Sequence, residues 1–165
     1  MNDPIIRENF VARVYAYRHW QALVESGISK HKLTSFHAQY KYTVMSHNLV
    51  AYKELGRLLA RADLPLQEMA EQYISGLMAA LTIKATRKNH SNTLSHIQGY
   101  FSKYLNKEQR KELSEQVDAY RNGLVPLMVP LTLVNHYLLA HPNDYLAQQA
   151  YLNPYPESLK LRYGY

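Results

Sequence analysis

The sequence contains no cysteine. Disulfide bonds, thiolate catalysis, cysteine-held iron–sulfur clusters and cysteine zinc sites are therefore excluded for this chain. No P-loop, dinucleotide fingerprint, Gly-x-Ser-x-Gly elbow or HExxH motif occurs either. None of the eight histidines forms the i, i+4 pair that holds zinc on one helix. We therefore expect neither a metal site nor a cofactor.

Long apolar runs are also missing. The longest apolar stretch, residues 124–140, contains two prolines, an asparagine and a histidine. It is shorter than the roughly 20 apolar residues that span a bilayer, so it predicts a buried core helix. The first residues lack the basic and then apolar profile of a signal peptide. We expect a cytoplasmic protein without membrane contact.

The residues that are present favour a helical domain. The chain has 165 residues, of which 47% are apolar, enough for one domain of ordinary size that covers residues 1–165. Its apolar residues recur with helical spacing almost throughout, and no run alternates for long enough to predict a strand. The prediction is an all-α fold, a single bundle of six or seven helices with a short extended C-terminal tail.

Caps and breakers divide the chain into helices. Asp3-Pro4 opens a first helix that ends at Gly27. Asn106, with Gln109 three residues later, predicts a capping box. The other expected helices cover residues 29–47, 49–62, 66–81, 91–105, 125–140 and 144–151, with a polar, basic loop at 82–90. Phe10, Val14, Tyr17 and Val24 lie along one face of the first helix.

The charge is basic and uneven. Nineteen Lys and Arg against thirteen Asp and Glu give a net charge of +6. Residues 29–62 and 84–110 each carry a net +5, while residues 63–83 between them carry −3. This balance favours an anionic partner. We expect the stretches 41–61 and 84–110 to fold side by side into one anion-attracting concavity, with solvated helix faces as the alternative.

The segment 84–92 carries Lys84, Arg87, Lys88 and His90 just before the expected helix start at Ser91 or Asn92. Helix N-termini attract anions through free N–H groups and partial positive charge. Arginine adds a planar fork that fits phosphate. A phosphate site is the functional hypothesis for this segment, and a solvated basic loop is the alternative.

A second cluster lies on the expected helix 29–47. His37, Tyr40 and Lys41 stand at i, i+3 and i+4 and so share a face. Tyr40 and Lys41 there can stack on a base and pair with a phosphate, or form a core edge under a lysine stem. The fifteen tyrosines of the chain offer further stacking surfaces wherever they lie exposed beside Lys or Arg.

Histidine is the remaining candidate for chemistry. The ordinary pKa of an imidazole, near 6.5, suits acid–base catalysis. If they face one cleft, four histidines are catalytic candidates, and otherwise they are hydrogen-bonded core residues. They are His37, His47, His90 and His96.

Several spaced motifs together resemble the YbgA-like family of bacterial proteins, a domain largely of unknown function. The resemblance covers about residues 7–162. The motifs are Phe36-His37-x-x-Tyr40-Lys41, Tyr52-x-x-Leu55-Gly56-Arg57, Arg87-x-x-His90-x-Asn92, His96-x-x-Gly99-Tyr100-Phe101, Tyr120-Arg121-x-Gly123 and Tyr145-x-x-Gln148-x-x-Tyr151-Leu152.

The resemblance implies a function in RNA binding. Some relatives join this domain to an iron–sulfur desulfidase that acts on thiolated pyrimidines, and there the domain is credited with binding tRNA that carries 4-thiouridine. Without cysteine this chain cannot hold that cluster. We therefore expect a non-enzymatic RNA-binding module, with tRNA as its partner. The expected contacts are Lys41, Arg57, Lys84, Arg87, Lys88 and Arg121 to phosphates, and Tyr40, His90 and Tyr100 to a nucleotide.

Two alternatives remain at this point. One is a small enzyme whose histidines perform acid–base chemistry on a nucleotide or nucleoside. The other is an adaptor for a separately encoded desulfidase, whose sign would be a sizeable apolar surface patch. The sequence leaves the oligomeric state open.

Overall fold

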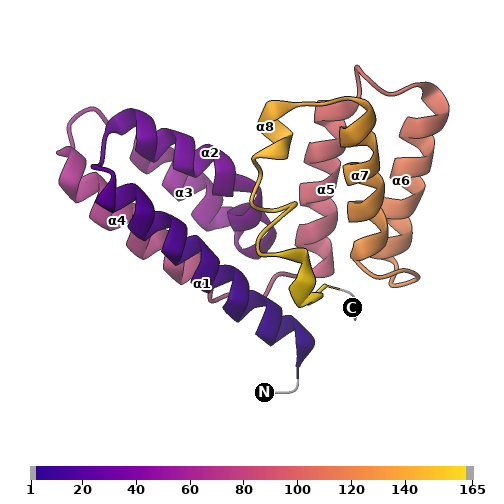
Figure 1. Ribbon diagram of the computed structural model, residues 1–165, viewed down its shortest axis with the longest axis horizontal. Helices are drawn as coiled ribbons and strands as arrows, with labels where there is room; N and C mark the ends of the chain where they lie inside the picture. The colour runs from indigo at the N-terminus through magenta and orange to yellow at the C-terminus, as the bar shows by residue number, and fades with distance from the viewer. Residues whose placement is uncertain (1–2, 163–165) are drawn as a thin grey trace.

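The computed structural model describes residues 3–162, and within them it is all helical, with no strand (Figure 1). The predicted fold class is confirmed. The helices are α1 (Pro4–Glu25), α2 (Lys30–His47), α3 (Leu49–Ala60), α4 (Leu66–Ala80), α5 (Arg87–Phe101), α6 (Lys107–Arg121), α7 (Met128–Ala140) and α8 (Asp144–Ala147), followed by a short 3₁₀-helix, η1 (Glu157–Leu159).

Local sequence signals set several helix ends. The Asp3 carboxylate accepts a hydrogen bond from the backbone N–H of Ile5 at 2.8 Å, directly before the proline that opens α1. The predicted capping box of α6 is present, since Asn106 and Gln109 exchange bonds of 2.8 and 3.0 Å. Gly123 follows α6 with a φ of 76°, a left-handed conformation that glycine adopts without strain.

The start of α5 differs from the prediction. Thr86 rather than Ser91 or Asn92 caps it, and its hydroxyl accepts from the Asn89 N–H at 3.1 Å. Threonine is a good cap, and the Arg-Lys pair that follows has high helix propensity, so the helix nucleates one turn earlier. Arg87 and Lys88 therefore belong to the first turn of α5 and not to a loop.

The C-terminal part also departs from the predicted boundaries. The helix predicted over 125–140 begins at Met128, and the one predicted over 144–151 ends at Ala147. The tail from Asn153, expected to be extended, contains the 3₁₀-helix η1. Helix α7 buries Leu131, Val134 and Tyr137, which confirms a core helix. None of the helices in residues 3–162 has the length and apolarity to span a bilayer.

The core has two parts. One lies among α1–α4 around Trp20, Phe36 and Tyr73, and the other joins the end of α2 to α5, α6, α7 and the C-terminal segment. Figure 1 shows these two groups side by side. Helix α2 contributes Tyr40 and Val44 to the first core but Tyr42 and Met45 to the second. The predicted single bundle therefore holds two hydrophobic clusters that α2 connects.

Candidate nucleic-acid interface

The predicted RNA contacts lie in two separate places. Lys41 and Tyr100 contact Tyr145 of α8, and Arg57 lines a pocket between α2 and α3. Lys84 and Arg87 instead line a pocket at the N-terminus of α5. Arg87 and Tyr100 are 13 residues apart on one helix, which is roughly 20 Å along its axis. The two basic stretches therefore do not form the single concavity that we expected from the sequence.

The first place is built around the ring of Tyr145 on α8. The Nζ atom of Lys41 lies 5.0 Å from the centre of this ring and 5.2 Å from that of Tyr42. Tyr100 stacks on Tyr145 with a centroid distance of 5.0 Å and an interplanar angle of 25°. We call Lys41, Tyr42, Tyr100 and Tyr145 the tyrosine platform. It combines a cation with stacked aromatic rings, and Tyr100 is 39% exposed at its outer side.

A shallow pocket adjoins the platform across α2 and α3. It has a volume of about 370 Å³ and is lined by His37, Tyr52, Lys53, Gly56, Arg57 and Ala60. His37 lies one turn before Lys41 on α2, so the pocket continues the face of the platform. The cations at this face are therefore Lys41, Lys53 and Arg57.

His37 contributes hydrogen bonding rather than charge to this pocket. Its Nδ1 atom lies 3.1 Å from the Tyr73 hydroxyl. Burial, together with the nearby Lys41 ammonium, lowers the pKa of the His37 imidazole to about 4. The ring is neutral at pH 7 and holds the outer face of α2 to the core tyrosine beneath it.

The structure corrects the role predicted for Tyr40. Its side chain is only 3% exposed, its ring stacks on Phe36 at 4.6 Å, and its hydroxyl is bonded to His19. Burial raises the pKa of the Tyr40 hydroxyl. Because α2 packs on both sides in this region, the residue next to Lys41 faces inward. Tyr40 is a core residue and cannot stack on a base in this fold.

The second place is the N-terminus of α5. A pocket of about 260 Å³ there is lined by Ile5, Lys84, Ala85, Thr86, Arg87, His90 and Tyr120. Both cations that line this pocket already have partners within the chain. The Lys84 ammonium lies 3.4 Å from the Asp3 carboxylate, and the Arg87 guanidinium lies 4.9 Å above the Tyr120 ring and donates to the Tyr120 carbonyl at 3.0 Å. Lys88 is exposed on the same turn.

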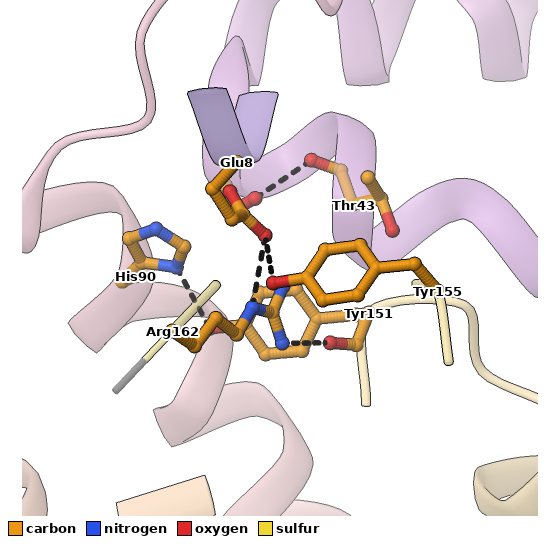
Figure 2. A network of polar contacts seen from close by, with 7 residues as sticks. Glu8, Thr43, His90, Tyr151, Tyr155 and Arg162 are labelled. Atoms are coloured by element: carbon orange, nitrogen blue, oxygen red, sulfur yellow. Dashed lines mark hydrogen bonds and ion pairs between the residues drawn. The ribbon is translucent and has the colours of Figure 1, made fainter. Parts of the chain in front are cut away.

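A buried polar network lies beneath this second place (Figure 2). The Arg162 guanidinium donates to the Glu8 carboxylate at 3.0 Å and to the Tyr151 carbonyl at 2.7 Å, and the Tyr155 hydroxyl donates to Glu8 at 3.1 Å. Glu8 and Arg162 are 3% and 7% exposed. This ion pair connects the first helix to the C-terminal tail.

Two histidines meet at the edge of this network. His90 Nδ1 lies 2.9 Å from the Tyr151 hydroxyl, and His47 donates through Nδ1 to the Ile83 carbonyl at 2.6 Å. Burial lowers the pKa of both imidazoles, and the Arg162 charge acts in the same direction. Both rings are therefore neutral core groups. His90, predicted as a nucleotide contact, is 4% exposed.

The four candidate catalytic histidines do not converge. His37 lines the pocket beside the platform, His47 and His90 lie at the buried network, and His96 is exposed on α5. Residues 3–162 contain no group of three His, Asp or Glu side chains that could hold a metal ion. The four histidines therefore do not line one common cleft.

One predicted phosphate contact lies away from both places. Arg121, at the end of α6, is exposed, and its guanidinium is 3.9 Å from the Asp118 carboxylate. It does not line the platform or the pocket beside it.

The sequence did not predict Tyr42, Tyr145 or Lys53 as binding residues, although Tyr145 begins one of the motifs that carry the family resemblance. Tyr145 stands in the first turn of a four-residue helix that Asn143 caps, so its position depends on tertiary packing. Lys53 stands four residues before Arg57, a spacing that places two cations on one helix face. The spacing of Lys53 and Arg57 can be recognised in the sequence, whereas the contacts of Tyr145 with Lys41 and Tyr100 cannot.

Comparisons with known proteins support the resemblance. The family described as "Protein of unknown function (DUF1722)" matches residues 41–156, which include the whole platform. The chain is also 29% identical over 166 residues to "Uncharacterized protein YbgA" of Escherichia coli (strain K12), covering 99% of this chain and 98% of that protein. No solved structure matches the chain. With most of its length matched by the family model, this chain belongs to the YbgA-like family described as DUF1722.

Proposed function

We propose that this protein is a non-enzymatic RNA-binding module, that tRNA is its ligand, and that it acts in the metabolism of thiolated nucleosides. The observation that supports this proposal is the tyrosine platform, where Lys41 lies over Tyr145 and an exposed Tyr100 stacks on the same ring. Every nucleobase has a flat face that can stack on tyrosine, and lysine pairs with the phosphate beside it. The choice of tRNA and of thiolated nucleosides comes from the family resemblance.

The pocket beside the platform extends the surface that RNA would cover. Lys53 and Arg57 there supply two further cations, and neutral His37 supplies a hydrogen-bonding group. At the far end of α5, exposed Lys88 remains a predicted phosphate contact. A folded RNA the size of tRNA can reach both places, which are roughly 20 Å apart along the helix.

Titration of labelled bulk tRNA against the protein at several salt concentrations tests the proposal. Removal of Tyr100 by Tyr100→Ala deletes the exposed stacking surface, and we expect the affinity to fall about 5- to 100-fold. In Lys41→Ala and Arg57→Ala one phosphate contact is lost, and the slope of log affinity against log salt should become shallower by about 0.7–0.9 for each.

Lys111→Ala is the matched control. Lys111 is an exposed α6 lysine that pairs with Glu115 and lines neither the platform nor the pocket beside it, and its removal changes the net charge by the same amount. We expect it to leave the affinity almost unchanged. Absence of binding at low salt, a salt slope near zero, or equal losses in Lys111→Ala and Lys41→Ala would each contradict the proposal.

The link to thiolated nucleosides has its own test. Competition between tRNA with and without 4-thiouridine should favour the thiolated form. Equal affinities would leave RNA binding in place but remove the assignment to thiolated-nucleoside metabolism.

A further inference from the structure

The outer face of α1 carries five large apolar side chains that the rest of the chain covers only in part. Their exposures range from 41% to 56%. We call this row the α1 stripe. It consists of Ile6, Phe10, Val14, Tyr17 and Val24, together with Gln21, which lies between the last two. Figure 1 shows α1 along the outer edge of the first helical group.

The stripe is long and regularly spaced. Its members follow one another at intervals of four, four, three, four and three residues when Gln21 is included, and they extend for about 27 Å along the helix. Alternating steps of three and four residues are typical of a seam between two packed helices. Soluble monomers rarely expose a contiguous apolar row of this length. The stripe therefore has the form of half of a helix–helix interface.

The positions of the stripe residues are nearly symmetric about the middle of α1. If a second α1 lies antiparallel, with the symmetry axis between Tyr15 and Ala16, Val14 of each copy meets Tyr17 of the other. In the same register Phe10 meets Gln21, and Ile6 lies close to Val24. A surface that complements itself in this way is what a two-fold symmetric dimer requires.

The charges beside the stripe fit the same register. Arg7 and Glu25 are 18 residues apart, which is five helical turns, so they lie on the same flank. Both are exposed, and neither makes an ion pair within residues 3–162. In an antiparallel pair related by two-fold symmetry the same flanks face each other, so Arg7 of one copy meets Glu25 of the other at both ends.

The two remaining arginines of α1 lie away from the symmetry axis. Arg13 and Arg18 are each about 2.5 residues from that axis, so each is displaced by about five residues, or about 7.5 Å along the seam, from the same residue of the other copy. A partner other than this chain would need an acidic group against Arg7 and a basic group against Glu25, about 27 Å away along the helix. The self-complementary order of charges therefore favours a second copy of this chain as the occupant.

We propose that two copies of this protein form a symmetric dimer through antiparallel packing of their α1 helices along the α1 stripe. A single-helix seam lies at the low end of interface sizes, so the dimer should dissociate on dilution. The tyrosine platform lies on other helices and stays free in each copy.

Sedimentation velocity over a series of concentrations tests the proposal on the intact protein. The wild type should shift from 19.2 kDa toward twice that mass as its concentration rises. Phe10→Glu introduces a charge into the seam and should keep the protein monomeric, with a helical circular-dichroism spectrum like that of the wild type. Glu115→Arg, at an exposed acid of α6, is the matched control and should leave dimerisation unchanged.

A charge exchange tests the register. Arg7→Glu and Glu25→Arg should each weaken the dimer, because each places two like charges across the seam, and the double variant should restore it. This comparison does not depend on Phe10→Glu folding correctly. RNA binding by Lys41→Ala is measured separately, so failure of the dimer leaves the proposed function untouched.

Three outcomes would overturn the dimer. One is a wild type that stays at 19.2 kDa at every concentration. Another is a double charge variant no better than the single ones. The third is a monomer whose stripe instead binds anionic lipid vesicles or a different protein, with the binding lost in Phe10→Glu.

Discussion

The two cationic regions of this protein carry equal net charge in the sequence, yet the fold uses them differently. At the tyrosine platform the Lys41 ammonium lies over aromatic rings and has no ion pair within residues 3–162. At the start of α5 the Lys84 ammonium pairs with Asp3, and the Arg87 guanidinium is bonded to Tyr120. The comparison shows that the charges available to a ligand are those that the fold leaves without partners.

The aromatic residues of the two regions differ in the same way. Tyr100 is exposed and stacks on another surface ring, whereas Tyr120 and Tyr151 are almost fully buried. Burial raises the pKa of the Tyr120 hydroxyl to about 12, so it stays protonated and neutral at ordinary pH. One region leaves an aromatic ring exposed at the surface, and the other buries its rings against the end of the chain.

The largest effect that we expect comes from the network beneath α5. Arg162→Met leaves the Glu8 carboxylate buried without its cation, which should lower the free energy of unfolding by about 3–5 kcal/mol. Urea denaturation measures this change. The double variant Glu8→Gln/Arg162→Met removes both charges and should recover part of the loss. A single variant as stable as the wild type would show that the second region does not support the fold.

Acid should act on the histidines of both regions. The pKa values of His37, His47 and His90 are lowered in the folded protein, so below pH 6.5 the unfolded chain binds more protons than the folded one. The free energy of unfolding should then decrease as the pH is lowered, by up to about 1.4 kcal/mol per pH unit for each histidine.

His37→Gln isolates one of these contributions. For His37 the window runs from 6.5 down to about 4, and the variant should have a shallower dependence of unfolding free energy on pH over that window. If the variant shows the same dependence of unfolding free energy on pH as the wild type, His37 is not the neutral group described here. The same conclusion follows if His37 gains its charge, and RNA affinity rises with it, while the pH is still above 5.

A pair of single substitutions sharpens the comparison between the regions. Arg87→Ala removes a hydrogen bond to the Tyr120 carbonyl and a cation over its ring, so unfolding free energy should fall by about 1–2 kcal/mol. Lys41→Ala should change stability by less than about 0.5 kcal/mol but weaken tRNA binding. If Arg87→Ala is instead stable but defective in tRNA binding, the start of α5 and not the platform is the binding region.

The smallest expected effect concerns a glycine beside the platform. A Cβ atom added to Gly99, within α5, meets no atom within 4 Å, so Gly99→Ala should stabilise the fold by about 0.5–1 kcal/mol. In α4 the same change at Gly76 brings the new Cβ to 2.9 Å from a Leu55 methyl group, which should cancel the gain. Thermal unfolding of the two variants distinguishes these cases, and tRNA binding of Gly99→Ala should match that of the wild type.

Helix ends that depend on only a few neighbouring residues could be predicted from the sequence. Asp3-Pro4 and the Asn106–Gln109 box fix helix starts through bonds within one turn, and the structure has both. Tyr40 could not be placed, because its burial depends on helices that pack against α2 from two sides. The α5 start was missed because Thr86 and Ser91 are both acceptable caps, and the structure uses the earlier one, which brings the helix-forming Arg87 and Lys88 into the first turn.

The candidate site was predictable in part for the same reason. Lys41 and Arg57 were found because a basic residue on a helix face stays at the surface in most packings. The tyrosine platform also needed Tyr145, which lies more than a hundred residues from Lys41 in the sequence. The histidines were misjudged because burial, which the sequence does not reveal, decides whether an imidazole is charged.

The Glu8–Arg162 pair closes a loop of 154 residues, almost the full chain. During synthesis, Glu8 leaves the ribosome long before its partner, so the first helix must wait with an unpaired carboxylate until Arg162 emerges. A chain that is interrupted before Arg162 therefore lacks the counter-charge for a group that the native fold buries. Completion of this fold is in this way coupled to synthesis of Arg162, and products that end before it should be degraded because they are unstable.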